Sequence, residues 1–132
     1  MSLVIIVESA KGLPNVERFG KIDPFVELKF AGTKKKTKVI DDTTDPSWNE
    51  TIEFNLSDKP LTSSDSVELE VYDHEKIGRN RLLGSYTIAL RDVVKGKQRT
   101  KRQECKLKDS KGRQSEPQGL AKKSRIHRFS RN

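Results

Sequence analysis

Four acidic side chains lie in two loop segments that border β-patterned runs. The first segment carries Glu17 and Asp23, and the second carries Asp73 and Glu75. Carboxylate oxygens are the hard ligands that Ca²⁺ selects in proteins, but a carboxylate in a loop can also cap a turn. The four side chains form one site only if the fold brings the two loops together. On that condition the sequence predicts a Ca²⁺ site at Glu17, Asp23, Asp73 and Glu75.

One apolar side chain accompanies each acidic segment. Phe19 lies in the first segment, and Ile77 lies at the tip of the second. An exposed apolar residue at a loop tip can enter lipid, although single apolar residues on a surface are ordinary and Phe19 can instead pack under its own loop. We predict that Phe19 and Ile77 contact a membrane.

No arrangement of a nucleophile and a base is visible in the sequence. The chain has two histidines, of which His74 lies in the second acidic segment and His127 lies near the C-terminus. Neither belongs to a Ser/His/Asp or Cys/His pattern, and imidazole is a poor Ca²⁺ ligand. We predict that the protein is not an enzyme.

The charge is distributed unevenly along the chain. The 132 residues carry a formal net charge of +8. Residues 1–94 hold 13 Lys and Arg against 16 Asp and Glu, whereas residues 95–132 hold 14 against 3. A basic segment can bind phosphates without specificity, but this one lacks the interleaved aromatic residues of a stacking platform. We therefore expect no specific nucleic-acid partner.

Cysteine usage and the N-terminal residues indicate a cellular location. The single cysteine, Cys105, excludes an intramolecular disulfide and suits a reducing compartment. The apolar run at residues 3–7 is too short for a signal-peptide core or a membrane span. We expect a cytoplasmic protein whose membrane contact is peripheral.

Short apolar or alternating runs recur along the chain at regular spacing, with almost no helical periodicity. They cover residues 3–7, 25–30, 34–40, 52–56, 67–71, 83–90 and 103–108. Such a pattern predicts an antiparallel β-sandwich. The later residues are rich in turn formers and basic side chains, so we predict one domain over residues 1–114 and a disordered basic tail over residues 115–132.

Three motifs, in the order that a C2 domain has them, carry a family resemblance. Residues 20–26 (Gly-Lys-Ile-Asp-Pro-Phe-Val) resemble the first top loop of a C2 domain entering its strand. Residues 36–54, with Asp-Pro-Ser-Trp-Asn-Glu at their centre, resemble the central strand, turn and strand. Residues 71–84 resemble the third top loop. The opening residues 1–10 and the stretch 73–84 narrow the resemblance to the first C2 domain of a ferlin.

The resemblance implies a C2-type β-sandwich of seven to eight antiparallel strands with ferlin-like topology. It also implies a Ca²⁺-regulated module that binds anionic phospholipid membranes, within a protein that acts in membrane fusion or plasma-membrane repair. In many C2 domains a basic strand contacts acidic headgroups, although a solvated face is an equal alternative. By this resemblance the contact falls on Lys34, Lys35, Lys36 and Lys38.

The sequence departs from the family pattern in two places. Arg81 stands where many Ca²⁺-binding C2 domains have an aspartate, so we expect one ion at modest affinity. Residues 118–124 lack the alternation of the last ferlin-type strand, so we expect that strand to be missing and residues 3–7 to have an open edge. An open edge and a basic tail support an alternative function, a Ca²⁺-independent protein-interaction or regulatory fragment.

Overall fold

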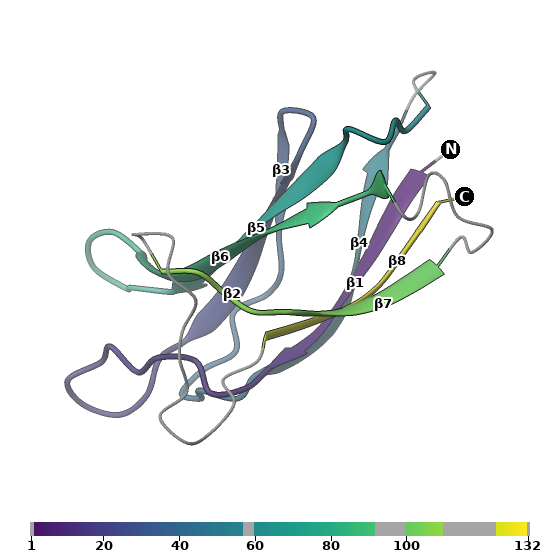
Figure 1. Cartoon of the computed structure of the whole chain (residues 1–132). Helices are drawn as coiled ribbons and strands as arrows, with labels where there is room; N and C mark the ends of the chain where they lie inside the picture. The colour runs from purple at the N-terminus through teal and green to yellow at the C-terminus, as the bar shows by residue number, and fades with distance from the viewer. Residues whose placement is uncertain (1, 57–59, 92–99, 110–123, 132) are drawn as a thin grey trace.

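The fold is a sandwich of two four-stranded antiparallel sheets (Figure 1). The computed structural model describes residues 2–56, 60–91, 100–109 and 124–131. One sheet has the strand order β4-β1-β8-β7, and the other has the order β3-β2-β5-β6. The strands are β1 (Ser2–Ala10), β2 (Pro24–Phe30), β3 (Thr33–Lys36), β4 (Ser47–Asn55), β5 (Ser66–Asp73), β6 (Arg81–Ala89), β7 (Thr100–Cys105) and β8 (Ser124–Arg131).

The core lies between the two sheets and is made by the apolar faces of the strands. In β1, Leu3, Ile5 and Val7 are buried, while Val4 and Ile6 between them are only half-buried. This is the period of a strand, in which successive side chains point to opposite faces. The expected antiparallel β-sandwich is therefore confirmed. In the described ranges, no helix combines the length and the apolar character needed to cross a membrane.

The central signature at the start of β4 joins the two sheets. Trp48 is buried, and its indole Nε1 donates a hydrogen bond of 3.3 Å to the Pro24 carbonyl of β2. The Glu50 carboxylate accepts a hydrogen bond of 2.9 Å from the Lys38 amide. Asn49 has a φ of 47°, a left-handed conformation that asparagine adopts more readily than most residues. These contacts fix the path of the chain from the loop of residues 37–46 into β4.

The structure corrects the expectation that the last strand is missing. The backbone of Ser124–Arg131 forms β8, which pairs with β1 on one side and with β7 on the other. The edge of β1 that we expected to be open is therefore covered. The prediction looked for this strand at residues 118–124, where the alternation fails, whereas β8 begins only at Ser124 and runs to Arg131. Ladder hydrogen bonds also use N–H and C=O groups that almost every residue carries, so the pairing itself leaves little trace in the sequence. The same strand corrects the predicted disordered tail for residues 124–131, which belong to the sandwich. Residues 110–123 lie outside the described residues, so what was predicted of them stays a prediction.

Three loops meet at one end of the sandwich, which we call the loop end, at the left of Figure 1. They comprise residues 11–23, 37–46 and 74–80. Asp42 links two of them, because its Oδ1 accepts a hydrogen bond of 2.9 Å from the Lys21 amide. The His74 amide donates to the Asp23 carbonyl at 2.9 Å and links the third. The fold thus brings together the two acidic segments that the sequence separates.

Candidate functional site: an acidic cluster that holds Arg81

The hairpin of β5 and β6 sets Asp73 opposite Arg81. Asp73 is the last residue of β5, Arg81 is the first residue of β6, and the two are direct partners across the ladder. The register shifts between Val71 and Tyr72, where β6 contains one extra residue. In the unshifted register, Asp73 would face Leu82 instead. The bulge therefore places a cation beside the carboxylate.

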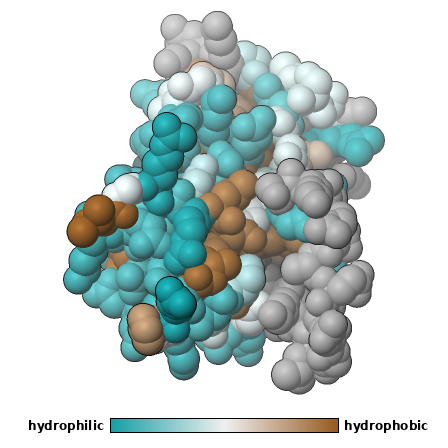
Figure 2. All heavy atoms as spheres, turned by 90° about the vertical axis from the view of Figure 1, so that its left-hand side faces the viewer, coloured by the Kyte–Doolittle hydropathy of each residue, from teal (hydrophilic) through white to brown (hydrophobic). Residues whose placement is uncertain are grey.

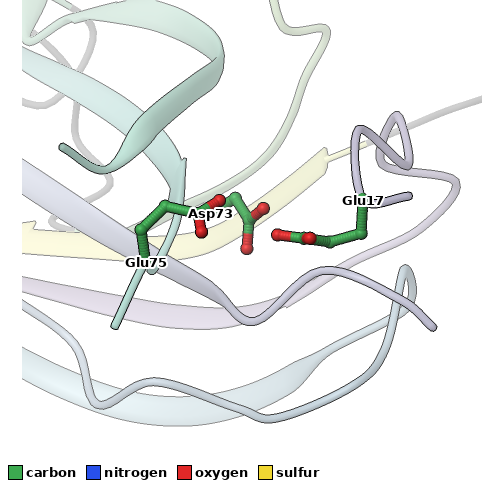
Figure 3. Close-up of side chains that lie close together, drawn as sticks. All are labelled: Glu17, Asp73 and Glu75. Carbon is green, nitrogen blue, oxygen red and sulfur yellow. The ribbon is translucent and has the colours of Figure 1, made fainter. Parts of the chain in front are cut away.

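Three carboxylates converge at this point of the loop end. Glu17, Asp73 and Glu75 each offer an oxygen, and these oxygens lie within 4.8 Å of one another. Figure 3 shows Glu17 and Glu75 reaching toward Asp73 from opposite sides. Asp73 is fully buried, whereas the other two are half-buried. Three of the four predicted Ca²⁺ ligands thus lie together.

The guanidinium of Arg81 lies among these oxygens and contacts all three carboxylates. Its Nη2 lies 2.8 Å from Glu17 Oε1 and 3.1 Å from Asp73 Oδ2. Its Nε lies 2.9 Å from Glu75 Oε1. Its Nη1 donates a hydrogen bond of 2.8 Å to the carbonyl of Val16. One side chain therefore links the loop of residues 11–23 to the end of β5 and to the loop of residues 74–80.

The electrostatics of the cluster follow from burial and from the excess of acids. Burial above all, and then the hydrogen bond and charge of Glu17, raise the pKa of the Asp73 carboxyl above its usual 3.8. The Asp23 amide, which donates to Asp73 Oδ1 at 2.9 Å, and the Arg81 guanidinium oppose this rise. Removal from water works against the charge of Arg81, but Glu17 and Glu75 raise its pKa on balance. Arg81 therefore stays charged.

Asp23, the fourth predicted ligand, has a different role in this arrangement. Its Oδ1 accepts a hydrogen bond of 2.8 Å from the Asp42 amide, and the converging trio does not include it. The carboxylate caps the neighbouring loop, which is the alternative that the sequence left open. Asp23 nevertheless lines the same open hollow as Glu17 and Glu75. Its part in binding a cation stays a prediction.

Large exposed apolar side chains lie at the loop end, and two of them line this hollow. Phe19 is 86% exposed and Ile77 is 92% exposed, and both line the hollow. Val16 and Leu82, at 40% and 39%, are the other large exposed apolar residues in the described part of the chain. Figure 2 faces this end and shows brown apolar surface among teal polar atoms. Val16 and Leu82 were not predicted from the sequence, since nothing in their local pattern separates them from core residues.

The four predicted lysines are exposed, but several of them contact the protein. Lys34 lies 3.7 Å from Glu27, and the Lys36 ammonium lies 5.9 Å from the centre of the Phe25 ring. Lys35 donates to the Glu53 carbonyl. Lys38 is exposed, and it is its main-chain amide that makes the contact to Glu50 of β4 described above.

The pairing registers also place acidic residues on the face that Lys34 and Lys36 share, whereas Lys35 pairs with the buried Leu28 on the other face. Glu27 is the direct partner of both Lys36 and Glu70. Directly paired residues point to the same side of a sheet. The basic charge on this face is therefore partly balanced, so the lysines are less available to lipid than their run in the sequence indicates.

The donor set of the cluster suits a hard cation in its chemistry. Carboxylate oxygens and the Val16 carbonyl are the ligand types that Ca²⁺ takes, and Ca²⁺ needs about 6–8 oxygens. The three grouped carboxylates reach that number only with bidentate contacts, further carbonyls or water. The residues fit the ion in type and position, with one obstacle, which is that Arg81 uses the same oxygens.

The sequence and the fold together define the class of protein. The model of the C2 domain family matches residues 1–105, so the chain belongs to the C2 domain family. Mouse myoferlin is 47% identical to it over 92 residues, which are 70% of this chain and 4% of that protein, and human myoferlin has the same values. The chain is thus a ferlin-like C2 domain, as the motifs predicted, and it spans a small part of the length of these relatives.

Solved structures share the fold. A C2 domain of plant Extended Synaptotagmin 1 matches with a TM-score of 0.77 and 24% identity, covering 99% of this chain and 95% of that one. The calcium-bound pair of C2 domains of Extended-Synaptotagmin 2 matches with a TM-score of 0.75 and 23% identity, covering 98% of this chain and 44% of that one. At this level of identity the likeness shows the fold alone.

Proposed function

We propose that the chain binds anionic phospholipid membranes peripherally through its loop end, with Ca²⁺ as the regulating ion. The observation that carries the proposal is the grouping of exposed apolar side chains around the acidic hollow. In the described part of the chain, every large exposed apolar residue lies at this one end. Exposed apolar patches rimmed by polar groups mark membrane or partner contacts. Phe19 and Ile77, the most exposed, would enter the lipid first.

The acidic cluster accounts for regulation by the ion. Glu17, Asp73 and Glu75, with Asp23 from the same hollow, would hold Ca²⁺. Near an anionic surface, unneutralised carboxylates repel phosphates, and a bound divalent cation reverses that repulsion. The exposed lysines of β3 and Lys38 would add contacts with headgroups, each weakened by salt. The site is thus expected to bind membranes more tightly when Ca²⁺ is present.

The ferlin-like sequence supports a more specific role. Identity to myoferlin covers a single domain, so the activity of the whole parent protein is part of the proposal. We infer that the parent protein acts in membrane fusion or plasma-membrane repair on the cytoplasmic side of a membrane. A non-enzymatic role is expected for the domain itself.

The test is co-sedimentation of the full chain with vesicles of phosphatidylcholine, with and without phosphatidylserine, in Ca²⁺ and in chelator. Binding that requires phosphatidylserine and increases with Ca²⁺ is the expected result. Asp23→Asn combined with Asp73→Asn should remove the Ca²⁺-dependent part, since it removes two anionic groups from the candidate site. Glu53→Gln combined with Glu68→Gln removes the same charge from exposed positions elsewhere and should leave it unchanged. Equal binding to both vesicle types in Ca²⁺ would contradict the proposal.

The alternative, a Ca²⁺-independent interaction fragment, loses one of its supports. That hypothesis used the open edge of β1, and β8 pairs with this edge. The outer strands of the two sheets are β3, β4, β6 and β7. Of these, β3 is short and carries three consecutive lysines, features that oppose pairing with another strand. The edge of β1 on which this alternative relied is therefore not available, and β3 is a poor substitute for it.

A further inference from the structure

Arg81 occupies the place at which the acidic loops would hold a cation. Its nitrogens lie 2.8–3.1 Å from Glu17, Asp73 and Glu75, and a fourth contact reaches the Val16 carbonyl. These oxygens come from both acidic segments and include a main-chain carbonyl, as a Ca²⁺ site commonly does. The guanidinium therefore uses the same oxygen atoms that a metal ion would use.

The two cations exclude each other at these oxygens. A guanidinium is a planar group with five N–H donors and a charge that persists at any physiological pH. The carboxylate oxygens lie within 4.8 Å of one another, so the space between them accommodates one cationic centre. A divalent ion at the cluster would also lie within a few ångströms of the Arg81 charge. Repulsion at that distance is strong, and only movement of Arg81 relieves it.

We propose that Arg81 is a tethered cation that holds the loop end assembled without metal and that must leave the cluster before Ca²⁺ can bind there. The proposal deepens the proposed function, because it assigns the control of the ion site to one residue. While Arg81 is in place, the three carboxylates keep one positive partner and the loops stay joined. Phe19 and Ile77 are then presented to a membrane even in the absence of Ca²⁺.

Release of Arg81 adds a second consequence at the same surface. The side chain is 45% exposed already, and it starts β6 beside the hollow that Phe19 and Ile77 line. An arginine freed from carboxylates at this position can bind the phosphate of a lipid in a bidentate manner. Exchange of Arg81 for Ca²⁺ therefore makes the cluster more positive and supplies a new phosphate ligand.

The experiment compares the full chain with Arg81→Gln and with the matched variant Arg79→Gln. Arg79 is exposed in the same loop, so its substitution removes an equal charge from the hairpin while the cluster keeps its arginine. Calorimetric titration with CaCl₂ should show that Arg81→Gln binds Ca²⁺ about tenfold or more tightly than the wild type, because the ion no longer competes with a charge at the same oxygens. Arg79→Gln should stay within about threefold of the wild type, the gain from a more distant, screened charge.

Thermal unfolding supplies an independent readout. In chelator, Arg81→Gln should melt at a lower temperature than the wild type. Addition of Ca²⁺ should raise the melting temperature of Arg81→Gln by more than it raises that of the wild type. Arg81→Lys keeps the charge but loses the fork of donors, and it should show an intermediate Ca²⁺ affinity. This variant keeps the comparison open if Arg81→Gln does not fold.

The outcomes separate this inference from the proposed function. Equal Ca²⁺ affinities of the wild type and the Arg81 variants, or no Ca²⁺ binding by any of them, would overturn the tethered cation. Vesicle binding of each variant is measured separately in Ca²⁺ and in chelator, so membrane binding is judged on its own, while absence of Ca²⁺ binding by every variant would also remove Ca²⁺ as the regulating ion. If Arg81→Gln binds Ca²⁺ more tightly than the wild type but no variant binds vesicles, the exchange of cations is supported and the proposed membrane binding is contradicted.

Discussion

Replacing Ile77 with alanine tests whether the loop tip enters lipid. Ile77 is 92% exposed, so almost all of its side chain is available to a membrane and the fold makes little use of it. The change removes three carbon atoms, each of which contributes about 0.8 kcal/mol when it is buried in an apolar medium. Full insertion would therefore cost the variant about 2.4 kcal/mol of membrane affinity, and insertion to half depth about 1.2 kcal/mol. The lower figure corresponds to a roughly eightfold weaker partition coefficient.

The assay is a titration of vesicles that contain phosphatidylserine, followed by co-sedimentation, with the stability of each variant measured by urea unfolding. Ile77→Ala should leave the free energy of unfolding within about 0.5 kcal/mol of the wild type, as exposed positions commonly do. Thr51→Ala, an exposed substitution on β4 away from the loop end, is the control and should not change partitioning. A partition coefficient of Ile77→Ala equal to that of Thr51→Ala would refute lipid insertion by this loop.

Two further predictions concern the stability of the fold. Gly84→Ala should destabilise the domain by about 1–3 kcal/mol in urea unfolding, because a Cβ at this position would lie 2.7 Å from the Cβ of the buried Leu107. An unchanged midpoint would mean that the segment carrying Leu107 moves freely. The raised pKa of Asp73, caused first by burial and then by Glu17, means that the folded state binds this proton more tightly than the unfolded chain. Its contribution to stability is complete below the ordinary pKa of 3.8 and is lost as the pH rises through the raised value. In chelator, the stability of the wild type relative to Asp73→Asn should therefore fall as the pH rises through that window, and a constant or rising difference would contradict this sign.

The local patterns of the sequence sufficed for the fold class and for much of the candidate site. Alternation such as that of Leu3, Ile5 and Val7 depends on a two-residue period that any half-buried strand must obey, so it can be recognised without a structure. The motif around Trp48 indicated the family because it combines several specific residue types in a fixed order, and the match to the C2 family model confirms that indication. The acidic loops were recognisable because carboxylates and turn formers stand next to each other in the chain.

The alignment of one strand on its neighbour was beyond such patterns. Pairing of β8 with β1 uses backbone groups that carry no residue-specific signal, so the strand was sought at residues 118–124 although it lies at Ser124–Arg131. The placement of Glu27 on the face of the predicted basic strand arises in the same way, since it depends on the register between β2 and β3.

The sequence by itself determined which residues are available to bind a cation, and it marked Arg81 as a departure at a ligand position. Only the tertiary structure decided that Arg81 points into the cluster. That outcome depends on one extra residue in β6, which shifts the register so that Arg81 rather than Leu82 faces Asp73. It also depends on the loop of residues 11–23, which brings Glu17 to the same guanidinium. Charge and ligand type are properties of single residues, whereas the oxygens around a cation are set by where distant segments meet in space.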